Sequence, residues 1–168
     1  MQKLWKHSLY VSSLCHVLAD QLPGINREDA LLAGLVNDIG IIPLFQFAEQ
    51  HPEEFPDIEQ LNPLIPYLRG PMGKVVMQSL DFSDEFICVP SIAENWLYDS
   101  GAKIQLADVV ILGKLHSYFG TEQAKELPYI HSIPAYAKLK DAKLNADFSL
   151  NIIQQAQQRI NDTMNLFS

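Results

Sequence analysis

Apolar residues recur at three- and four-residue steps along most of the chain, which is the spacing of amphipathic helices. The clearest case is the segment 3–22, whose expected buried side is formed by Leu4, Val11, Leu14, Leu18 and Leu22. Pro23 and Gly24 are expected to end this helix. No alternating strand pattern competes with the helical one anywhere in the chain, so the pattern predicts an all-α fold.

The second and third helices are predicted from their boundary residues. Asn26 stands where an N-cap belongs, with acidic residues in the following turn to suit the helix dipole. This helix is expected to run to about Asn37, and Gly40 is expected to break or bend it. Pro43 suits the first turn of a third helix that continues to Gln50.

The rest of the chain is predicted to alternate loops with further helices. Five prolines and two glycines between Pro52 and Gly73 predict a loop-rich connection with one turn near residues 57–61. A helix over residues 83–98 is expected to kink or split at Pro90. The other expected helices lie at residues 74–80, 106–119, 121–126, 134–139 and 149–167.

Composition narrows the class of protein. The chain has 168 residues, 48% of them apolar, which suits one domain over residues 1–168 with a real core. A net charge of −8 with scattered basic residues argues against a nucleic-acid partner. Two cysteines without a CxxC pair, no signal peptide and no membrane-length apolar run predict a cytoplasmic protein without a membrane partner.

His7 and Asp38 are the polar residues that the helical pattern places on buried faces. His7 lies on the side of Val11 and Leu14, and Asp38 lies in line with Gly34. A buried imidazole and a buried carboxylate are costly unless they are paired or bind a metal. We therefore weigh a metal or phosphate site against a structural His–Asp hydrogen bond between two helices that Gly34 allows to approach, and favour the hydrogen bond.

The remaining candidate chemistry is sparse. A catalytic divalent metal needs at least three protein ligands and an open position. The other histidines lie apart from His7 and are expected to be surface or hydrogen-bonded residues: His16, His51, His116 and His131. The chain contains no HExxH, no GxSxG, no GxxxxGK[ST] and no GxGxxG, so the common nucleophile, zinc and nucleotide motifs are absent.

Three motifs resemble the HDOD domain, a relative of the HD-type metal phosphohydrolases. They are the segments LWKHS (4–8), EDALLAGLVNDIG (28–40) and LP followed by IPAY (127–136). The resemblance extends in order over nearly the whole chain. It implies an all-α, HD-domain-like helical bundle that corresponds to the C-terminal half of an HDOD domain, with the family's preceding helical half absent from these residues.

The resemblance also implies where metal ligands are missing. HD hydrolases use a His, a His-Asp pair, further histidines and a late Asp, and only His7 and Asp38 match this pattern. Asn37 replaces the paired histidine, and neither residues 70–74 nor the segment around Glu94 supplies another. Lys114 stands near the expected late aspartate and would repel a dication. We therefore expect vestigial ligand positions, no metal, no cofactor and no catalysis.

Three functions follow from this reading. The first is a non-catalytic signal-transduction or regulatory module, a pseudoenzyme that binds protein partners in bacterial signalling. The second is a metal-dependent phosphohydrolase acting on a nucleotide or cyclic dinucleotide, with Asp108 or Glu94 as an additional ligand. The third is a small-molecule sensor without turnover. Because the family's other helical half is absent, we also expect an exposed apolar surface that drives self-association into a homo-oligomer.

Overall fold

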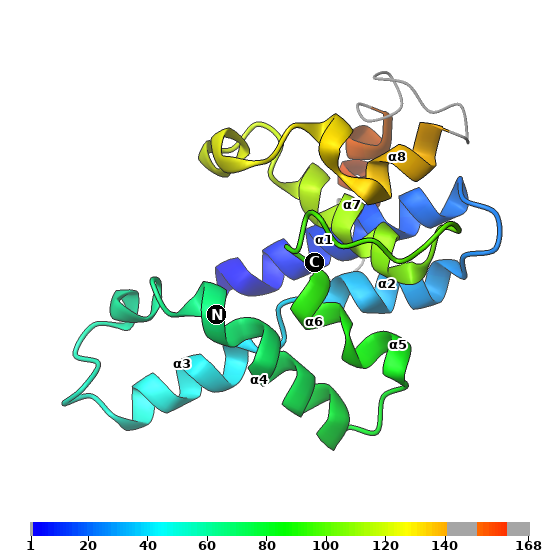
Figure 1. The fold of residues 1–168 in the computed structure, drawn as a ribbon. Helices are drawn as coiled ribbons and strands as arrows, with labels where there is room; N and C mark the ends of the chain where they lie inside the picture. Colours follow the sequence, from blue (N-terminus) through cyan, green and yellow to red (C-terminus); the bar gives the residue numbers. More distant parts are fainter. Residues whose placement is uncertain (1, 141–150, 161–168) are drawn as a thin grey trace.

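The computed structural model describes residues 2–140 and 151–160, and these are helical with no strand among them. The prediction of an all-α fold is confirmed. Figure 1 shows α1 (Gln2–Asp20), α2 (Arg27–Val36) and α7 (Leu106–Ser117) at the centre of the bundle. These three helices contact one another, and their buried apolar side chains form most of one continuous core. The other helices pack around this centre.

The first two helices form as their sequences predict. Asn26 caps α2 by accepting hydrogen bonds from the backbone N–H groups of Glu28 and Asp29. Gly34 permits the close crossing of α1 and α2, because a Cβ atom there would lie 2.7 Å from the Cα of Ser12. The Ser12 hydroxyl also donates to the Leu31 carbonyl across this crossing, at 2.7 Å.

A second pair of helices extends from one end of the bundle (Figure 1). It consists of α3 (Ile41–Gln50) and α4 (Ile65–Ser79), joined by a connection that contains the 3₁₀ turn η1 (Ile58–Leu61). The expected loop over residues 52–73 is wrong in its second half, where α4 begins at Ile65. Pro66 lies in the first turn of α4, where a missing N–H costs no hydrogen bond.

Pro71 lies inside α4, where the prolines were expected to prevent a helix. Neighbouring segments pack closely against α4 on both sides of this proline. A Cβ atom on Gly40 would lie 2.0 Å from the Arg69 carbonyl oxygen, and one on Gly73 would lie 2.3 Å from the Cβ of Pro90. The turn before α3 and the start of α6 therefore press directly against α4.

The predicted 83–98 helix splits as expected but is shorter. It becomes α5 (Asp84–Ile87) and α6 (Val89–Ile92), which meet at Cys88, and residues 93–105 form no regular helix. The predicted 106–119 helix is confirmed as α7, with a capping box between Gln105 and Asp108. Every residue of α7 is buried, including Lys114 and His116.

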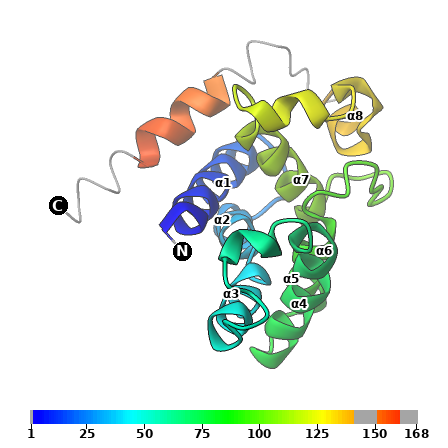
Figure 2. The ribbon, with the colours of Figure 1, turned by 90° about the vertical axis from the view of Figure 1, so that its left-hand side faces the viewer.

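The last described elements cover one side of α1 and α7. They are the 3₁₀ turns η2 (Glu122–Glu126) and η3 (Ile130–Ser132), the helix α8 (Pro134–Lys140) and a helical stretch at 151–160. Figure 2 shows this last stretch on the side of α1. Its buried residues Ile152 and Ala156 lie on the predicted apolar face. The remainder of the predicted 149–167 helix lies outside the described residues.

Within the described residues, Arg27–Gln50 passes a test for membrane-spanning helices by length and composition, with a mean hydropathy of 1.6. Half of that window is buried inside the protein. Residues 37–40 interrupt it with a turn that carries the buried Asp38. The segment therefore has the features of two core helices, α2 and α3.

Candidate functional site

His7 and Asp38 lie close together but are not hydrogen-bonded. Asp38 follows α2 in the turn at residues 37–40, and its side chain is only 3% exposed. The His7 Nε2 atom is 3.9 Å from the Asp38 Oδ2 atom, which is too long for a hydrogen bond. The favoured direct His–Asp hydrogen bond is therefore wrong, because a third side chain lies between the two residues.

That side chain is Lys114, whose ammonium group occupies the centre of a buried polar cluster. The Lys114 side chain is 1% exposed and donates to the Asp38 carboxylate. Its Nζ atom is also 3.2 Å from the His7 Nε2 atom and 3.5 Å from the Glu94 Oε1 atom. The ammonium has only donors, so the His7 Nε2 atom accepts and the neutral ring carries its proton on Nδ1.

Arg69 and Tyr118 complete the cluster around Glu94. The Arg69 Nη1 atom donates to Asp38 at 3.2 Å and to Glu94 at 2.5 Å. The Tyr118 hydroxyl donates to the same Glu94 Oε1 atom at 2.5 Å. His7 stacks against the Tyr118 ring, with 5.9 Å between the ring centroids. The cluster therefore joins α1, the 37–40 turn, α4, the segment after α6, and the end of α7.

The electrostatics of the cluster favour fixed protonation states. Burial lowers the pKa of His7, and the positive charge of Lys114 lowers it further, so the ring is kept neutral. Burial alone would raise the pKa of Glu94. The hydrogen bond and charge of Arg69, together with the charge of Lys114, outweigh burial and lower that pKa to about 2. Two carboxylates thus face two cations, and their charges balance.

Asn37, the residue in place of the paired histidine, does not take part in this cluster. It is fully buried, and its amide nitrogen donates to the Gly34 carbonyl in the last turn of α2, at 2.7 Å. Its Oδ1 atom has no hydrogen-bond partner among the described residues. Asn37 therefore stabilises the end of α2 and supplies no donor atom to the cluster.

Of the additional ligands considered for a hydrolase, Glu94 lies in the cluster and Asp108 does not. Asp108 accepts from the backbone N–H of Gln105, from Ser100 and from Lys138, and so anchors the start of α7. Of the two additional ligands that the hydrolase alternative allowed, Asp108 is therefore not placed beside His7. Its carboxylate is used in a capping box and an ion pair instead.

The other histidines are separate from the cluster, as expected. The Nδ1 atoms of His51 and His116 pair with carbonyl oxygens of their own helices. His16 differs from the expectation, because it is buried and its Nδ1 atom has no hydrogen-bond partner. Over the residues that the structure describes, no group of three or more His, Cys, Asp or Glu side chains is placed to hold a metal ion.

A metal ion of the HD type does not fit the residues present. The paired-histidine position supplies an amide bonded to its own helix, and the ligand position near α7 supplies an ammonium. The carboxylates that would ligate a metal already pair with Lys114 and Arg69. The donor set is therefore incomplete and already neutralised by protein cations.

Sequence reasoning identified His7, Asp38, Glu94 and Lys114 but missed Arg69 and Tyr118. Arg69 lies in the segment that was expected to be loop. Its sequence environment, an arginine between apolar residues and a glycine, was the only sequence signal of its burial. Tyr118 directly follows α7, four residues after Lys114 and so on the same side of the helix.

Two hollows adjoin the cluster and share Leu4 and Asp38. One is a polar cavity of about 520 Å³ that contains the cluster residues. The other is an apolar groove of about 250 Å³, lined mainly by Leu4, Trp5, Leu35, Val36, Ile39 and Ile42. Trp5 is 59% exposed and lies on the surface beside this groove.

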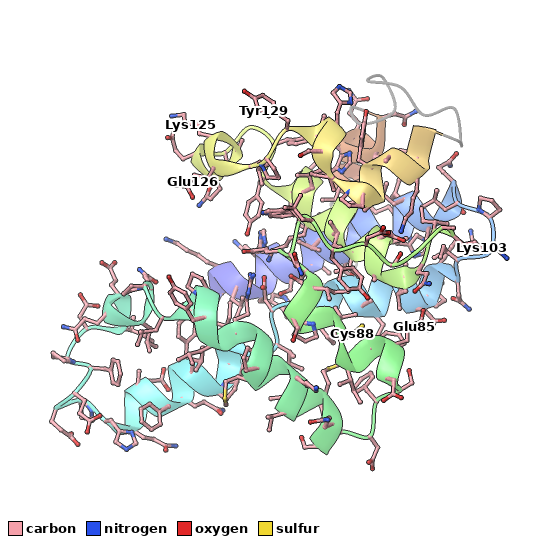
Figure 3. All side chains as sticks on the ribbon, in the orientation of Figure 1. Glu85, Cys88, Lys103, Lys125, Glu126 and Tyr129 are labelled. Carbon is pink, nitrogen blue, oxygen red and sulfur yellow. The ribbon has the colours of Figure 1, made fainter. Side chains whose placement is uncertain are left out.

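The two cysteines are free thiols, as expected from their spacing. Burial raises the pKa of Cys15 to about 12, so this thiol is inert. Cys88 is partly buried and donates to the Glu85 carbonyl at 3.0 Å; Figure 3 shows both residues at α5. The labelled residues Lys125, Glu126 and Tyr129 project from the segment before α8 (Figure 3).

Comparison with known proteins supports the helical family that the motifs indicated. Residues 1–66 match the family model of the HDOD domain, so the resemblance is confirmed over this part of the chain. These residues include His7, Asn37 and Asp38 but not Arg69, Glu94 or Lys114. No curated protein matches the chain.

A solved structure with the same fold comes from Shewanella amazonensis and is described as a "Putative metal-dependent phosphohydrolase". The TM-score is 0.68 at 25% sequence identity. The match covers 94% of this chain and 59% of the other, so this chain spans only part of that protein's length. The described bundle is therefore an HD-like helical fold.

Proposed function

We propose that this protein is a non-catalytic regulatory module that acts through protein partners in bacterial signalling. One observation carries the proposal: the Lys114 ammonium lies between His7, Asp38 and Glu94, the very donors on which a hydrolase would rely. In this interpretation, the hydrolase scaffold is retained while its ligand atoms are used to hold helices together.

Electrostatic repulsion opposes metal binding in this cluster. A dication placed about 4 Å from one ammonium is disfavoured by about 8 kcal/mol at an effective dielectric constant of about 20. The Arg69 guanidinium, which already contacts both Asp38 and Glu94, adds to this repulsion. A metal would have to displace both cations before it reached the carboxylates.

The apolar groove supports a protein as the partner. Leu35, Val36 and Ile42 line this groove, so an apolar side chain of a partner would be buried there. Trp5 on its rim is a residue type that is enriched among binding hot spots. The acidic net charge of −8 argues against nucleic acid as the partner.

We propose that the same groove also mediates self-association of the protein. Light scattering at rising protein concentration is expected to show a mass above that of the monomer, and Trp5→Ser is expected to reduce it. Tyr129→Ser is the matched control, because Tyr129 is 90% exposed but does not line the groove. A clean monomer at high concentration would rule out self-association through this surface.

A second candidate is a metal-dependent phosphohydrolase acting on a nucleotide or cyclic dinucleotide. It is favoured by the structural neighbour's description and by the convergence of His7, Asp38 and Glu94. A sensor that binds a small molecule in the polar cavity without turnover is a third. Both would use the same cavity, and they differ in metal content and turnover.

Metal analysis of the purified protein tests the proposal. We expect neither stoichiometric iron, manganese or zinc nor hydrolysis of phosphate esters when these metals are added. The comparison variant combines His7→Ala with Asp38→Ala, and His131→Ala controls for adventitious binding by a histidine outside the cluster. Near-stoichiometric metal that is lost only in the double variant would overturn the proposal and favour the hydrolase.

A further inference from the structure

A second polar hollow lies toward the C-terminal end of α1, away from the Lys114 cluster. It has a volume of about 270 Å³ and is bounded by the last turns of α1, the first residue of α2 and the helical stretch at 151–160. Figure 2 shows this stretch beside α1. Apart from Val17, the lining residues are polar or charged: His16, Asp20, Arg27, Gln155, Gln158 and Arg159.

The lining of this hollow is positively charged, although the chain as a whole is acidic. Two arginines and one aspartate give it a net charge of +1, whereas the whole chain carries −8. The Arg27 Nη1 atom is 2.8 Å from the Asp20 Oδ1 atom, but both side chains are about half exposed. An exposed ion pair of this kind contributes at most about 1 kcal/mol, so Arg27 can also bind a second anion. Guanidinium groups are well suited to oxyanions, because several N–H donors lie in one plane.

His16 forms a buried wall of the hollow. The residue is only 6% exposed, and no described residue forms a hydrogen bond with its Nδ1 atom, which is shielded from solvent. A buried polar atom without a partner costs about 1–3 kcal/mol. Such atoms are rare in native proteins and often mark the place of an ion or a bound molecule. The wall beside the two arginines therefore has unused hydrogen-bonding capacity.

We propose that this hollow binds a small tetrahedral oxyanion, the phosphate group of inorganic phosphate or of a small phosphate ester, with Arg27 and Arg159 as its cationic ligands. Its volume lies just below the range of about 300–1,000 Å³ that is typical of pockets for drug-sized ligands. Because the lining comes from three elements, a bound anion fastens the 151–160 stretch to α1 and α2. The site is separate from the Lys114 cluster and does not depend on the proposed function.

His16 makes the binding dependent on pH. In the free protein, burial lowers the pKa of His16, the charges of Arg159 and Arg27 lower it further, and those of Glu28 and Asp20 oppose this effect. A bound anion adds negative charge beside the ring and so raises the pKa of His16. The complex therefore takes up protons more readily than the free protein, and the anion should bind more tightly as the pH falls.

Calorimetric titration of the full chain with sulfate tests the proposal, because the charge of sulfate is constant between about pH 7.5 and about pH 5.5. We expect one saturable site with a Kd about tenfold lower at the acidic end, which corresponds to a pKa change of about one unit. Inorganic phosphate and glycerol phosphate are compared at about pH 7.5. Tighter binding of the ester identifies a phosphorylated small molecule as the ligand, and tighter binding of phosphate identifies the free ion.

Substitutions in the lining should change the Kd in opposite directions. Arg159→Gln should raise it at least tenfold, because one of the two cationic ligands is lost. Lys125→Gln is the matched control: it removes an exposed charge outside the hollow and should leave the Kd unchanged. Asp20→Asn should lower the Kd about two- to fivefold, because it removes the carboxylate that competes for Arg27. A damaged fold cannot produce this gain.

His16→Gln should abolish the pH dependence of sulfate binding. If this variant does not fold, NMR titration of the His16 ring in the unaltered chain replaces it, and sulfate should move the midpoint of His16 to higher pH. The absence of saturable sulfate binding overturns the proposal. Equal Kd values for Arg159→Gln and the unaltered chain, or a His16 midpoint that sulfate leaves unchanged, also overturn it.

Discussion

Replacing Lys114 with methionine should strongly destabilise the fold. Methionine keeps most of the length of the buried side chain but removes the charge that faces Asp38, which is 3% exposed. Breaking one partner of a buried ion pair generally costs about 3–5 kcal/mol, because a buried charge is left uncompensated. The other contacts of the two carboxylates decide where in this range the cost falls.

Two features place the expected cost near the lower end. Arg69 remains 3.2 Å from the Asp38 Oδ1 atom and retains part of the compensation. Glu94 is 27% exposed, so water can solvate part of its charge. We therefore expect Lys114→Met to lower the free energy of unfolding by about 3 kcal/mol and Tm by roughly 6–12 °C.

Urea unfolding followed by circular dichroism measures this loss, and Lys125→Met is the control. Lys125 pairs with Glu122 at 2.6 Å, but both side chains are largely exposed, so this substitution should cost less than about 0.5 kcal/mol. Adding Asp38→Asn to Lys114→Met should cost less than the sum of the two single changes. A Lys114→Met protein within about 0.5 kcal/mol of the parent would refute the assigned role of the cluster.

Three further predictions concern the helix crossing, the first cap and the pH dependence. Gly34→Ala should destabilise the fold by about 1–3 kcal/mol, because the new Cβ atom would lie 2.7 Å from the Ser12 backbone. Urea unfolding measures this loss, and an unchanged urea midpoint would contradict the close crossing of α1 and α2. Asn26→Ala should cost about 1 kcal/mol and Asn26→Asp much less, and equal losses would show that the side-chain cap is unimportant. Burial lowers the pKa of His7 below its ordinary value of 6.5, so near that pH the unfolded chain binds more protons than the folded chain. Stability should therefore fall as the pH drops through about 6.5, and it should fall less in His7→Gln. Glu94 adds a second loss between its unfolded pKa of 4.5 and its folded value of about 2, and stability that rises on acidification would contradict both assignments.

The helices could be predicted from the sequence wherever periodicity and caps agreed. Asn26 and Gly34 illustrate this, because each acts within a turn or across one crossing of neighbouring helices. The start of α4 could not be predicted, because Pro66 and Pro71 indicate a loop when only the neighbouring sequence is considered. Packing of Gly40 and Gly73 against distant backbone and side chains outweighs that local signal.

The residues of the candidate site could also be predicted only in part from the sequence. His7 and Asp38 follow from a motif, and the motif also drew attention to Lys114. The contacts between them do not follow, because Lys114 and His7 are 107 positions apart and Arg69 and Glu94 are 25 apart. No periodicity encodes a contact between such distant positions. Only the folded chain shows that an ammonium separates the histidine from the aspartate.

The hydrogen-bonding capacity of the cluster is largely used by contacts among its own members. A catalytic centre keeps some capacity for substrate or water, as an open metal position does. Here the Lys114 ammonium donates to His7 and Asp38 and forms an ion pair with Glu94, whose Oε1 atom is 3.5 Å away. The Glu94 Oε1 atom in turn accepts from Arg69 and Tyr118. Such a network of hydrogen bonds and ion pairs fixes the relative positions of the helices that it joins.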